Sequence, residues 1–444
     1  MTAARVARSA GGWLLLASLF YAPWALGCVQ PWTVRILAAM TLSSCALWAI
    51  GLVLRHARPK IPRVAAACIA LLLLQGCWMI LNAHGRYLGD SIIPIDSHWP
   101  GGPGAVDGPV CRAMLLQITA VLAALIVACD LASEHVWRWR LIATLGATAF
   151  SIATWGLLQK IGLLPALAHR EYQESVFATF DYHGNAGAFL NLGIPAVFAL
   201  AIHRHRQGGV AALLICVAAA MANVSRAASA IAIGIVLALV AWKHFARRAP
   251  VATRPSRWLA PGLILAFVAA TLVAGSGAWR RWNTVPSMEV ENSPRLIMLQ
   301  IAAPMAVDAG FFGDGPGSFK LIYPDSPHLI RDLYKRWKVQ PYRVGEETSI
   351  YSYVHNDYLQ FIIEWGWIGA SLWTILIATA AFNGWRAYIR GAADERLIIA
   401  ASLIALSGVL VHALVDWPLQ VASLQLDVAV YLAILLASPQ CASY

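Results

Sequence analysis

Charged residues are scarce in this chain. Of its 444 residues, only 12% are Asp, Glu, Lys or Arg, while 59% are hydrophobic. A soluble globular domain carries roughly 25% charged residues, so the composition excludes an ordinary soluble domain. It indicates instead a polytopic membrane protein, most of which lies in lipid.

Acidic residues are scarcer than basic residues. The chain has 22 Asp and Glu against 33 Lys and Arg, which gives a formal net charge of +11. A large part of the basic excess lies close to the ends of apolar stretches, where membrane topology explains it. We therefore expect membrane lipids, and no nucleic acid, among the partners of the chain.

Cysteine patterns that would indicate a metal site or a disulfide framework are absent. No two of the eight cysteines have the C-x-x-C spacing, and seven lie in or at the ends of apolar stretches, where we expect small packing residues. Cys28 and Cys111 both fall at far-side span ends, so a disulfide between them stays open. His and carboxylate residues at metal-ligand spacing are also lacking, and we predict no metal and no cofactor.

Long apolar stretches are what the chain does contain. A helix needs roughly 20 apolar residues to cross a hydrocarbon core about 30 Å thick. The seventh stretch is short, so eleven spans are the alternative to twelve. We predict an all-α bundle of about twelve transmembrane helices, near 11–28, 33–54, 64–83, 110–130, 138–158, 186–203, 209–224, 228–245, 258–278, 358–385, 397–415 and 419–438.

Basic residues set the orientation, because Lys and Arg near span ends are retained on the cytoplasmic side. They fall in every second loop, which places both termini in the cytoplasm. Arg5 and Arg8 precede the first span without a small-residue cleavage site, so we expect an anchor rather than a cleaved signal peptide. The other basic loop residues are Arg55, Arg58, Lys60, Arg63, Arg138, Arg140, Arg204, Arg206, Lys243, Arg247, Arg248, Arg254, Arg257, Arg386, Arg390 and Arg396.

The segment 279–357 is the one sizeable extramembrane element of this topology. It divides the chain into spans one to nine (1–278), a far-side loop (279–357) and spans ten to twelve (358–444). Basic residues from Arg280 to Arg343 stand in it, where lipid-linked anions could be met. Acidic residues share the segment, so a mixed solvated surface is the alternative to an anion-binding one.

A short helix is predicted inside this loop. Ser293-Pro294-Arg295 supplies an N-cap and a first-turn proline, and an apolar face follows over 296–302. About fourteen residues cannot cross the membrane, so the helix should lie parallel to the membrane or pack on the bundle. Arg295 joins a helix N-terminus that favours anions. We interpret it as a phosphate contact, with an exposed loop arginine as the alternative.

Three glycines follow that helix, at Gly313, Gly315 and Gly317. A nucleotide-binding loop would need a preceding strand in a βαβ unit, which the sequence does not provide. We predict a tight turn in which the backbone approaches a ligand or another helix.

The run His355-Asn356-Asp357-Tyr358-Leu359-Gln360 stands where the long loop re-enters an apolar helix. Asn356 or Asp357 should cap that helix. A helix N-terminus disfavours imidazolium, and a neutral histidine facing the far side can take a proton from a hydroxyl. We predict that His355 is a general base; an interfacial residue that helps to cap the helix is the alternative.

Further polar residues lie in or near the spans, where they are costly and by default functional or paired. Glu364 stands two turns beyond Asp357 on the same face, and His412 stands one turn from Asp416.

Ser225-Arg226 places another arginine in a very short far-side loop. Arg226, Arg295 and His355 come from separate segments on the same side. Two arginines and a histidine suit a pyrophosphate leaving group and a deprotonated acceptor.

The order of these motifs resembles the O-antigen ligase and polymerase superfamily of bacterial envelope glycosyltransferases. One departure is that the family often shows Asn-x-Asn near the sixth span, where this chain has Gly184-Asn185-Ala186-Gly187. Each piece is weak, but the ordered set is specific: His183-Gly184-Asn185-Ala186-Gly187-Ala188-Phe189-Leu190, Ser225-Arg226, Arg295 with the 313–319 turn, His355-Asn356-Asp357-Tyr358-Leu359, Glu364-Trp365-Gly366-Trp367-Ile368-Gly369, and His412 to Asp416.

The resemblance implies a glycan donor on undecaprenyl pyrophosphate in the periplasmic leaflet of the bacterial inner membrane. It implies metal-independent transfer of that glycan to a hydroxyl of lipid A core or of another glycan. His355 would activate the acceptor, and Arg226 and Arg295 would bind the pyrophosphate. Supporting roles would fall to Asn185, Asn356, Asp357, Glu364, His412 and Asp416.

Three acceptors stay open within the family. The motifs do not separate them, because acceptor choice lies in loop surfaces such as 84–109 and 320–350. We favour a ligase over a polymerase, and a protein O-glycosyltransferase is third because we expect no extra soluble C-terminal domain. A different class, a flippase or transporter of lipid-linked saccharides, would show two comparable halves with polar residues near mid-membrane. Here the polar groups collect at one face, which favours an enzyme.

Overall fold

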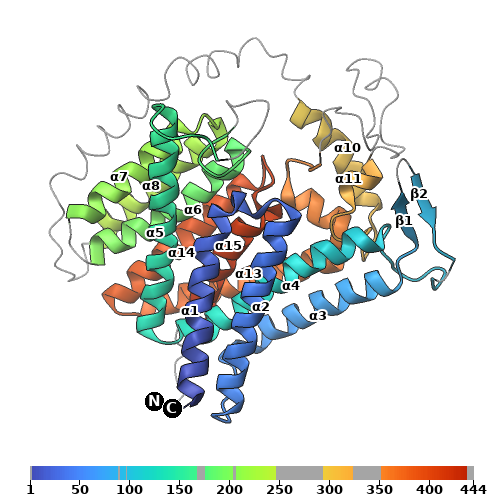
Figure 1. Cartoon of the computed structure of the whole chain (residues 1–444), viewed down its shortest axis with the longest axis horizontal. Helices are drawn as coiled ribbons and strands as arrows, with labels where there is room; N and C mark the ends of the chain where they lie inside the picture. The colour runs from blue at the N-terminus through green and yellow to red at the C-terminus, as the bar shows by residue number, and fades with distance from the viewer. Residues whose placement is uncertain are drawn as a thin grey trace.

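The computed structural model describes residues 3–88, 91–96, 98–167, 176–203, 207–246, 294–323 and 352–437. These form a bundle of helices with a small hairpin at one edge (Figure 1). The helices are α1 (Ala3–Trp24), α2 (Pro31–Val53), α3 (Arg63–Leu81), α4 (Gly108–Ala132), α5 (His135–Lys160), α6 (His183–His203), α7 (Gln207–Ala222), α8 (Arg226–Ala246), α10 (Pro294–Asp308), α11 (Phe319–Ile322), α13 (Asp357–Arg390), α14 (Ala393–His412) and α15 (Ala422–Leu436), with 3-10 turns η1 (Leu26–Cys28) and η5 (Pro418–Gln420).

The predicted polytopic helical fold is confirmed in its coarse form. Eight helices of the described residues are long and apolar enough to cross a membrane, namely α2, α3, α4, α5, α6, α8, α13 and α14; α7 and α15 are shorter apolar helices. The predicted first span, α1, is not among the eight, and the predicted ninth, 258–278, lies outside the described residues. The count of twelve therefore stays a prediction.

A hairpin interrupts the otherwise helical fold. Strands β1 (Gly85–Leu88) and β2 (Ser91–Pro94) pair antiparallel, with Gly85 opposite Pro94. They lie within the stretch 84–109, which the sequence predicts as a loop. The buried Asp107 side chain holds this loop, since it accepts from the backbone N–H groups of Tyr87 and Val110.

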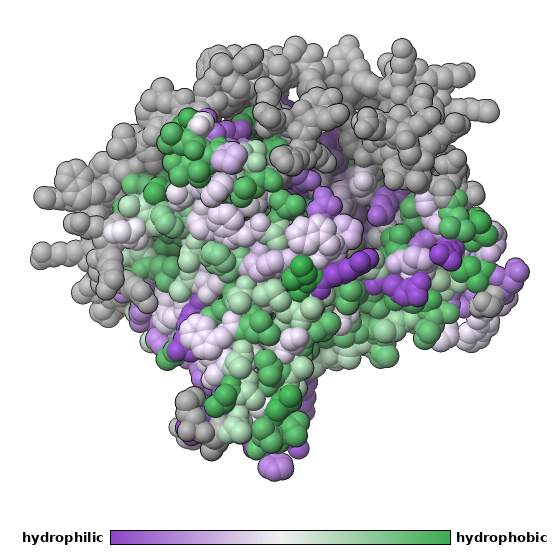
Figure 2. Space-filling view, viewed as in Figure 1, coloured by the Kyte–Doolittle hydropathy of each residue, from purple (hydrophilic) through white to green (hydrophobic). Residues whose placement is uncertain are grey.

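The centre of the bundle is formed by α4, α6 and α15, whose side chains are largely buried. The helices around them expose large apolar side chains, including Trp13 on α1, Trp32 on α2, Leu74 on α3 and Phe382 on α13. Apolar surface spreads over much of the face seen in Figure 2. A helix that is apolar on all sides suits a lipid environment, so the outer face fits the membrane interpretation.

Cys28 and Cys111 do not form the disulfide that the sequence left open. Both are buried free thiols, and they belong to different apolar clusters. They act as the small packing residues expected of the other cysteines.

Buried ion pairs fix the helices at the end of the bundle that carries the N-terminus of α1. Arg8 donates to Asp130 at 2.9 Å and also pairs with Glu134. Asp130 accepts a further hydrogen bond from Trp48, at 3.0 Å. Arg138, another arginine of the predicted basic loops, is buried and joins the half-buried Glu395 at 2.9 Å.

A sharp break divides α13 at Gly366, which has φ 64° and ψ −176°. The turn 310–317 fills the break, and backbone hydrogen bonds run in both directions. The N–H groups of Asp314 and Gly315 donate to the carbonyls of Ile363 and Glu364, and those of Trp367 and Ile368 donate to Gly310 and Phe311. The predicted glycine turn thus approaches another helix, because a Cβ on Gly313 would lie 2.4 Å from the backbone nitrogen of Gly366.

Replacing Gly366 by Ala should destabilise the protein by roughly 2 to 5 kcal/mol. A methyl group there would lie 2.4 Å from the backbone of Phe311, in a conformation that other residues rarely adopt. Thermal unfolding in detergent measures the effect. Gly234→Ala on α8 is the matched control, because nothing lies within 4 Å of its Cβ position; equal melting temperatures for the two variants would contradict the account.

Candidate active site

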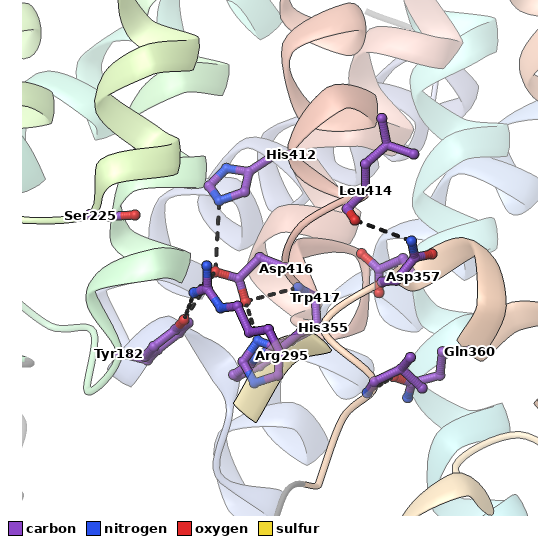
Figure 3. Close-up of polar contacts among 12 residues, drawn as sticks. Tyr182, Ser225, Arg295, His355, Asp357, Gln360, His412, Leu414, Asp416 and Trp417 are labelled. Atoms are coloured by element: carbon purple, nitrogen blue, oxygen red, sulfur yellow. Dashed lines mark hydrogen bonds and ion pairs between the residues drawn. The ribbon is translucent and has the colours of Figure 1, made fainter. Parts of the chain in front are cut away.

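A buried carboxylate, Asp416, is the centre of a polar cluster at the other end of the bundle (Figure 3). It lies in the short connection between α14 and η5, and its side chain is 1% exposed. Its backbone N–H donates to the carbonyl of His412 at 3.0 Å, which continues the last turn of α14. This local geometry directs the carboxylate toward three segments that are distant in sequence.

His355 is the first partner of Asp416. Its Nδ1 lies 3.0 Å from Oδ1 of the carboxylate. The backbone of His355 is in the left-handed region, with φ 58°, which is costly for a residue with a side chain. Such a conformation is typical of functional sites, where surrounding structure holds it in place.

Arg295 and Tyr182 meet the other oxygen of the carboxylate. The Tyr182 hydroxyl lies 3.0 Å from Oδ2. Arg295, in the first turn of α10, donates from Nη2 to the Tyr182 hydroxyl at 3.0 Å and to Oδ2 at 3.4 Å. The Arg295 side chain is 44% exposed, so part of its five-donor guanidinium faces outward.

The charges in this cluster determine which of its atoms carry a hydrogen. Burial alone would raise the pKa of Asp416, but the hydrogen bond from His355 and the positive charge of Arg295 outweigh it, so the pKa lies below its ordinary value. An ionised carboxylate only accepts hydrogen bonds, so Nδ1 of His355 carries the hydrogen. In the neutral ring, Nε2 is then the acceptor.

Burial, together with the charge of Asp416, raises the pKa of the Tyr182 phenol. The phenol therefore keeps its proton and donates it to Oδ2, while its oxygen accepts from Arg295. Tyr182 thus links the arginine to the carboxylate.

Three aromatic rings stack beside these side chains. Trp417 stacks on Tyr353 with ring centroids 4.0 Å apart, and on Tyr182 with centroids 5.4 Å apart. Tyr353 and Trp417 flank His355 and Asp416 in sequence, so the stack fixes both segments relative to Tyr182.

Glycine at position 184 permits the close approach of α6. A Cβ there would lie 2.6 Å from Oδ2 of Asp416. The His183-Gly184 pair of the sequence motif therefore lies against the cluster, beside Tyr182.

The predicted supporting residues next to His355 have structural contacts. Asn356 is the N-cap of α13, since its side chain accepts from the N–H of Leu359 at 3.1 Å; the alternative cap, Asp357, is wrong. Asp357 is buried and accepts from the N–H of Leu419 at 2.8 Å and from Gln420 at 3.1 Å. It ties the start of α13 to η5.

Glu364 is paired, and one of its partners, Gln360, also accepts from the backbone N–H of Val354, next to His355. Glu364 accepts from Gln360 at 3.0 Å and from the backbone N–H groups of Gly317 and Phe319. The carboxylate therefore anchors the glycine turn on α13.

His412 and Asn185 are buried close to the cluster. His412 Nε2 lies 3.9 Å from Oδ2 of Asp416, which is beyond a hydrogen bond. Within the described part of the chain, neither ring nitrogen of His412 and neither amide atom of Asn185 has a hydrogen-bond partner.

Arg226 is exposed at the N-terminus of α8. The first turn of this helix packs on α6, where Asn191 donates to the carbonyl of Ala228 at 3.0 Å. Arg226 therefore lies at the same end of the bundle as Gly184, on a neighbouring helix. The structure brings Arg295 and His355 to a shared carboxylate and gives Arg226 a separate position.

Sequence reasoning missed Tyr182, Tyr353 and Trp417. A weak signal existed for two of them, because each directly adjoins a residue of the motifs. Their roles depend on contacts between segments, so spacing alone could not assign them.

The described residues include no group of three or more His, Cys, Asp or Glu that could hold a metal ion. The expectation that no metal takes part stays a prediction, which a chelator can test.

The fold and the cluster define a polytopic helical membrane protein with a histidine, a carboxylate and an arginine joined at one end. A protein-family model described as O-antigen ligase matches residues 211–374. The match confirms the resemblance to the O-antigen ligase and polymerase superfamily, and it supports an activity of that general type. It contains Arg226, Arg295 and His355, whereas Asn185, His412 and Asp416 lie outside it. No curated protein sequence matches the chain.

Proposed function

We propose that this protein is a glycosyltransferase of the O-antigen ligase type. It moves a glycan from undecaprenyl pyrophosphate to a hydroxyl of lipid A core at the periplasmic face of the inner membrane. The observation that carries the proposal is the shared carboxylate: Asp416 holds both His355, at 3.0 Å, and Arg295, at 3.4 Å. The proposed base, His355, and the proposed anion-binding group, Arg295, are therefore held by the same carboxylate.

His355 acts as the general base. Asp416 fixes the ring through Nδ1 and stabilises the charge that the ring acquires. The acceptor hydroxyl gives its proton to Nε2 as its oxygen bonds to the anomeric carbon of the glycan. The bond from that carbon to the pyrophosphate oxygen breaks, and lipid pyrophosphate leaves with the electron pair.

Arg295 stabilises the leaving group. Its exposed donors suit a pyrophosphate, because guanidinium groups bind phosphate oxygens with paired hydrogen bonds. Arg226 supplies a second positive charge from α8. Negative charge grows on the leaving oxygen during the reaction, so these contacts favour the transition state over the bound donor.

A polymerase that lengthens the lipid-linked glycan would use the same cluster, and so would a protein O-glycosyltransferase. The ligase, polymerase and protein-modifying versions differ in the acceptor that reaches His355. A flippase or transporter is disfavoured, because the His355, Arg295 and Asp416 cluster lies at one end of the described helices.

The test is glycan transfer by the purified protein in detergent with EDTA. The donor is an undecaprenyl-pyrophosphate oligosaccharide, and the acceptor is lipid A core. Glycosylated core supports the ligase, and a lengthened donor glycan supports the polymerase. Transfer that needs an added divalent metal would contradict the metal-independent step, and no transfer to any acceptor would contradict the enzyme assignment.

Replacing Tyr182 by Phe should reduce transfer roughly 10- to 100-fold, since hydrogen bonds to charged groups are worth about 1.5 to 3 kcal/mol. The ring stack on Trp417 and the direct contact of Arg295 with Asp416 stay, but the hydroxyl that bonds both residues is lost. Initial rates at several donor concentrations measure the effect. Tyr388→Phe, which removes a hydroxyl bonded to Trp242 at 3.0 Å on other helices, is the control and should keep most of the activity.

A further inference from the structure

A second candidate site, of a different kind, lies away from Asp416, at the end of the bundle that carries the N-terminus of α1. This end is called the basic end below, because Lys60 and Arg63 lie there. A cavity of about 1210 Å³ opens among α3, the end of α4, α13 and α15. This exceeds the roughly 300 to 1,000 Å³ usual for pockets that hold small ligands. Neither the family match nor the proposed transfer reaction assigns anything to it.

Positive charge stands on one wall of the cavity. Lys60 and Arg63 line it and are exposed, and none of the described lining residues is acidic. The first turn of α3 adds to the charge, because its N-cap, Pro62, makes no side-chain hydrogen bond to it. This wall therefore attracts an anion.

The basic wall is held by the buried ion-pair network. The backbone N–H of Lys60 donates to Asp130 at 3.4 Å, and its carbonyl accepts from the Cys129 thiol at 3.3 Å. Asp130 is itself fixed by Arg8 and Trp48. The connection before α3 is thus anchored to α4, which places two cations at the rim.

The opposite wall is apolar and faces outward. Ile375 is 45% exposed and Phe382 is 59% exposed, both on the lining face of α13. Thr379 and Asn383 stand beside them and offer hydrogen bonds. A ligand that fits both walls carries a negative head and hydrocarbon chains.

We infer that this cavity binds an anionic glycerophospholipid of the leaflet at the basic end. The phosphate meets Lys60, Arg63 and the N-terminus of α3, while an acyl chain lies along Ile375 and Phe382. Basic pockets between membrane helices are suited to such head groups. The inference does not depend on the proposed glycan transfer.

The test is native mass spectrometry of the full chain, titrated with phosphatidylglycerol or with phosphatidylcholine. The expected result is a preference of tenfold or more for phosphatidylglycerol. Each basic side chain near a membrane surface is worth a factor of about five, so Lys60→Gln with Arg63→Gln should weaken phosphatidylglycerol binding about 25-fold. Phosphatidylcholine binding should stay unchanged.

Matched variants separate this site from general surface charge. Arg55→Gln with Arg58→Gln removes the same charge from exposed neighbours that do not line the cavity, and should change binding less than twofold. Ala378→Trp places a large ring in the cavity and should weaken binding with both basic residues present. Equal losses in the two double variants, full binding in Ala378→Trp, or no preference between the lipids would each overturn the inference.

A soluble competitor distinguishes a lipid from a free phosphate compound. Glycerol phosphate in large excess should not displace phosphatidylglycerol, because it lacks the chains that contact α13. Displacement would show a site for soluble phosphates and would overturn the lipid assignment.

Discussion

Replacing His355 by Asn is expected to reduce glycan transfer by about 100- to 10,000-fold, the usual contribution of a general base. Asn tolerates the left-handed backbone better than Ala does, and His355 has φ 58°. The substitution therefore removes the base without adding backbone strain. Single-turnover rates with a saturating lipid-linked donor measure the loss.

Donor binding and stability decide how the result is interpreted. The variant should bind the donor and melt near the wild-type temperature, because the α13 cap is Asn356. His135→Asn, at the opposite end on α5, is the matched control and should retain full activity. A His355→Asn variant with activity within tenfold of wild type would leave His355 as a positioning group and remove the proposed base.

Replacing Asp416 by Asn should reduce transfer by about 1,000-fold, within the range seen when the carboxylate that orients a catalytic histidine is lost. The amide can donate a hydrogen bond to His355, which favours the wrong ring tautomer. It also removes the negative charge of Asp416 from beside Arg295. Rates measured at several pH values should stay low in the variant throughout the neutral range.

The acid stability of the protein tests the same carboxylate independently. The pKa of Asp416 is lowered in the folded state, so the unfolded chain binds its proton more readily. The stabilisation is present above the ordinary Asp value of about 3.9 and is lost as the pH falls through the lower folded value. Melting temperature should therefore fall on acidification more steeply in wild type than in Asp416→Asn.

Asp394→Asn provides the control for both measurements. Asp394 lies in the first turn of the same helix, α14, and its side chain is 54% exposed. It should leave activity and acid stability close to wild type. A comparable loss in Asp394→Asn would show that the effect belongs to the stability of α14 rather than to the cluster.

The sequence predicted the helical membrane character of the chain because composition and apolar run length are local properties. It also predicted the short helix at Arg295 and the cap before α13, since each depends on a few adjacent residues. The number of spans stays a prediction of twelve or eleven: the described residues supply eight candidate spans and the shorter apolar helices α7 and α15. Their places in the bundle come from packing against other helices.

The sequence identified Glu364 and Asp416, with His412 beside it, as polar residues that are costly in or near lipid and are by default functional or paired. It predicted His355 as a base and Arg295 as a phosphate contact. The sequence did not show which of them meet. Asp416 bonds His355 and Arg295, while Glu364 bonds the glycine turn instead. Asp416 meets segments that are far away in the chain, whereas Glu364 also bonds Gln360, one turn away on its own helix.

What the sequence determined by itself is therefore the class of the chain: an apolar, polytopic, helical protein with the ordered motifs of one family. Only the tertiary structure decided that Tyr182 links Arg295 to Asp416, that Trp417 stacks between Tyr182 and Tyr353, and that the glycine turn fills the break in α13. Helix propensity and hydropathy act over neighbouring residues. Hydrogen bonds between distant segments form only when the whole bundle has packed.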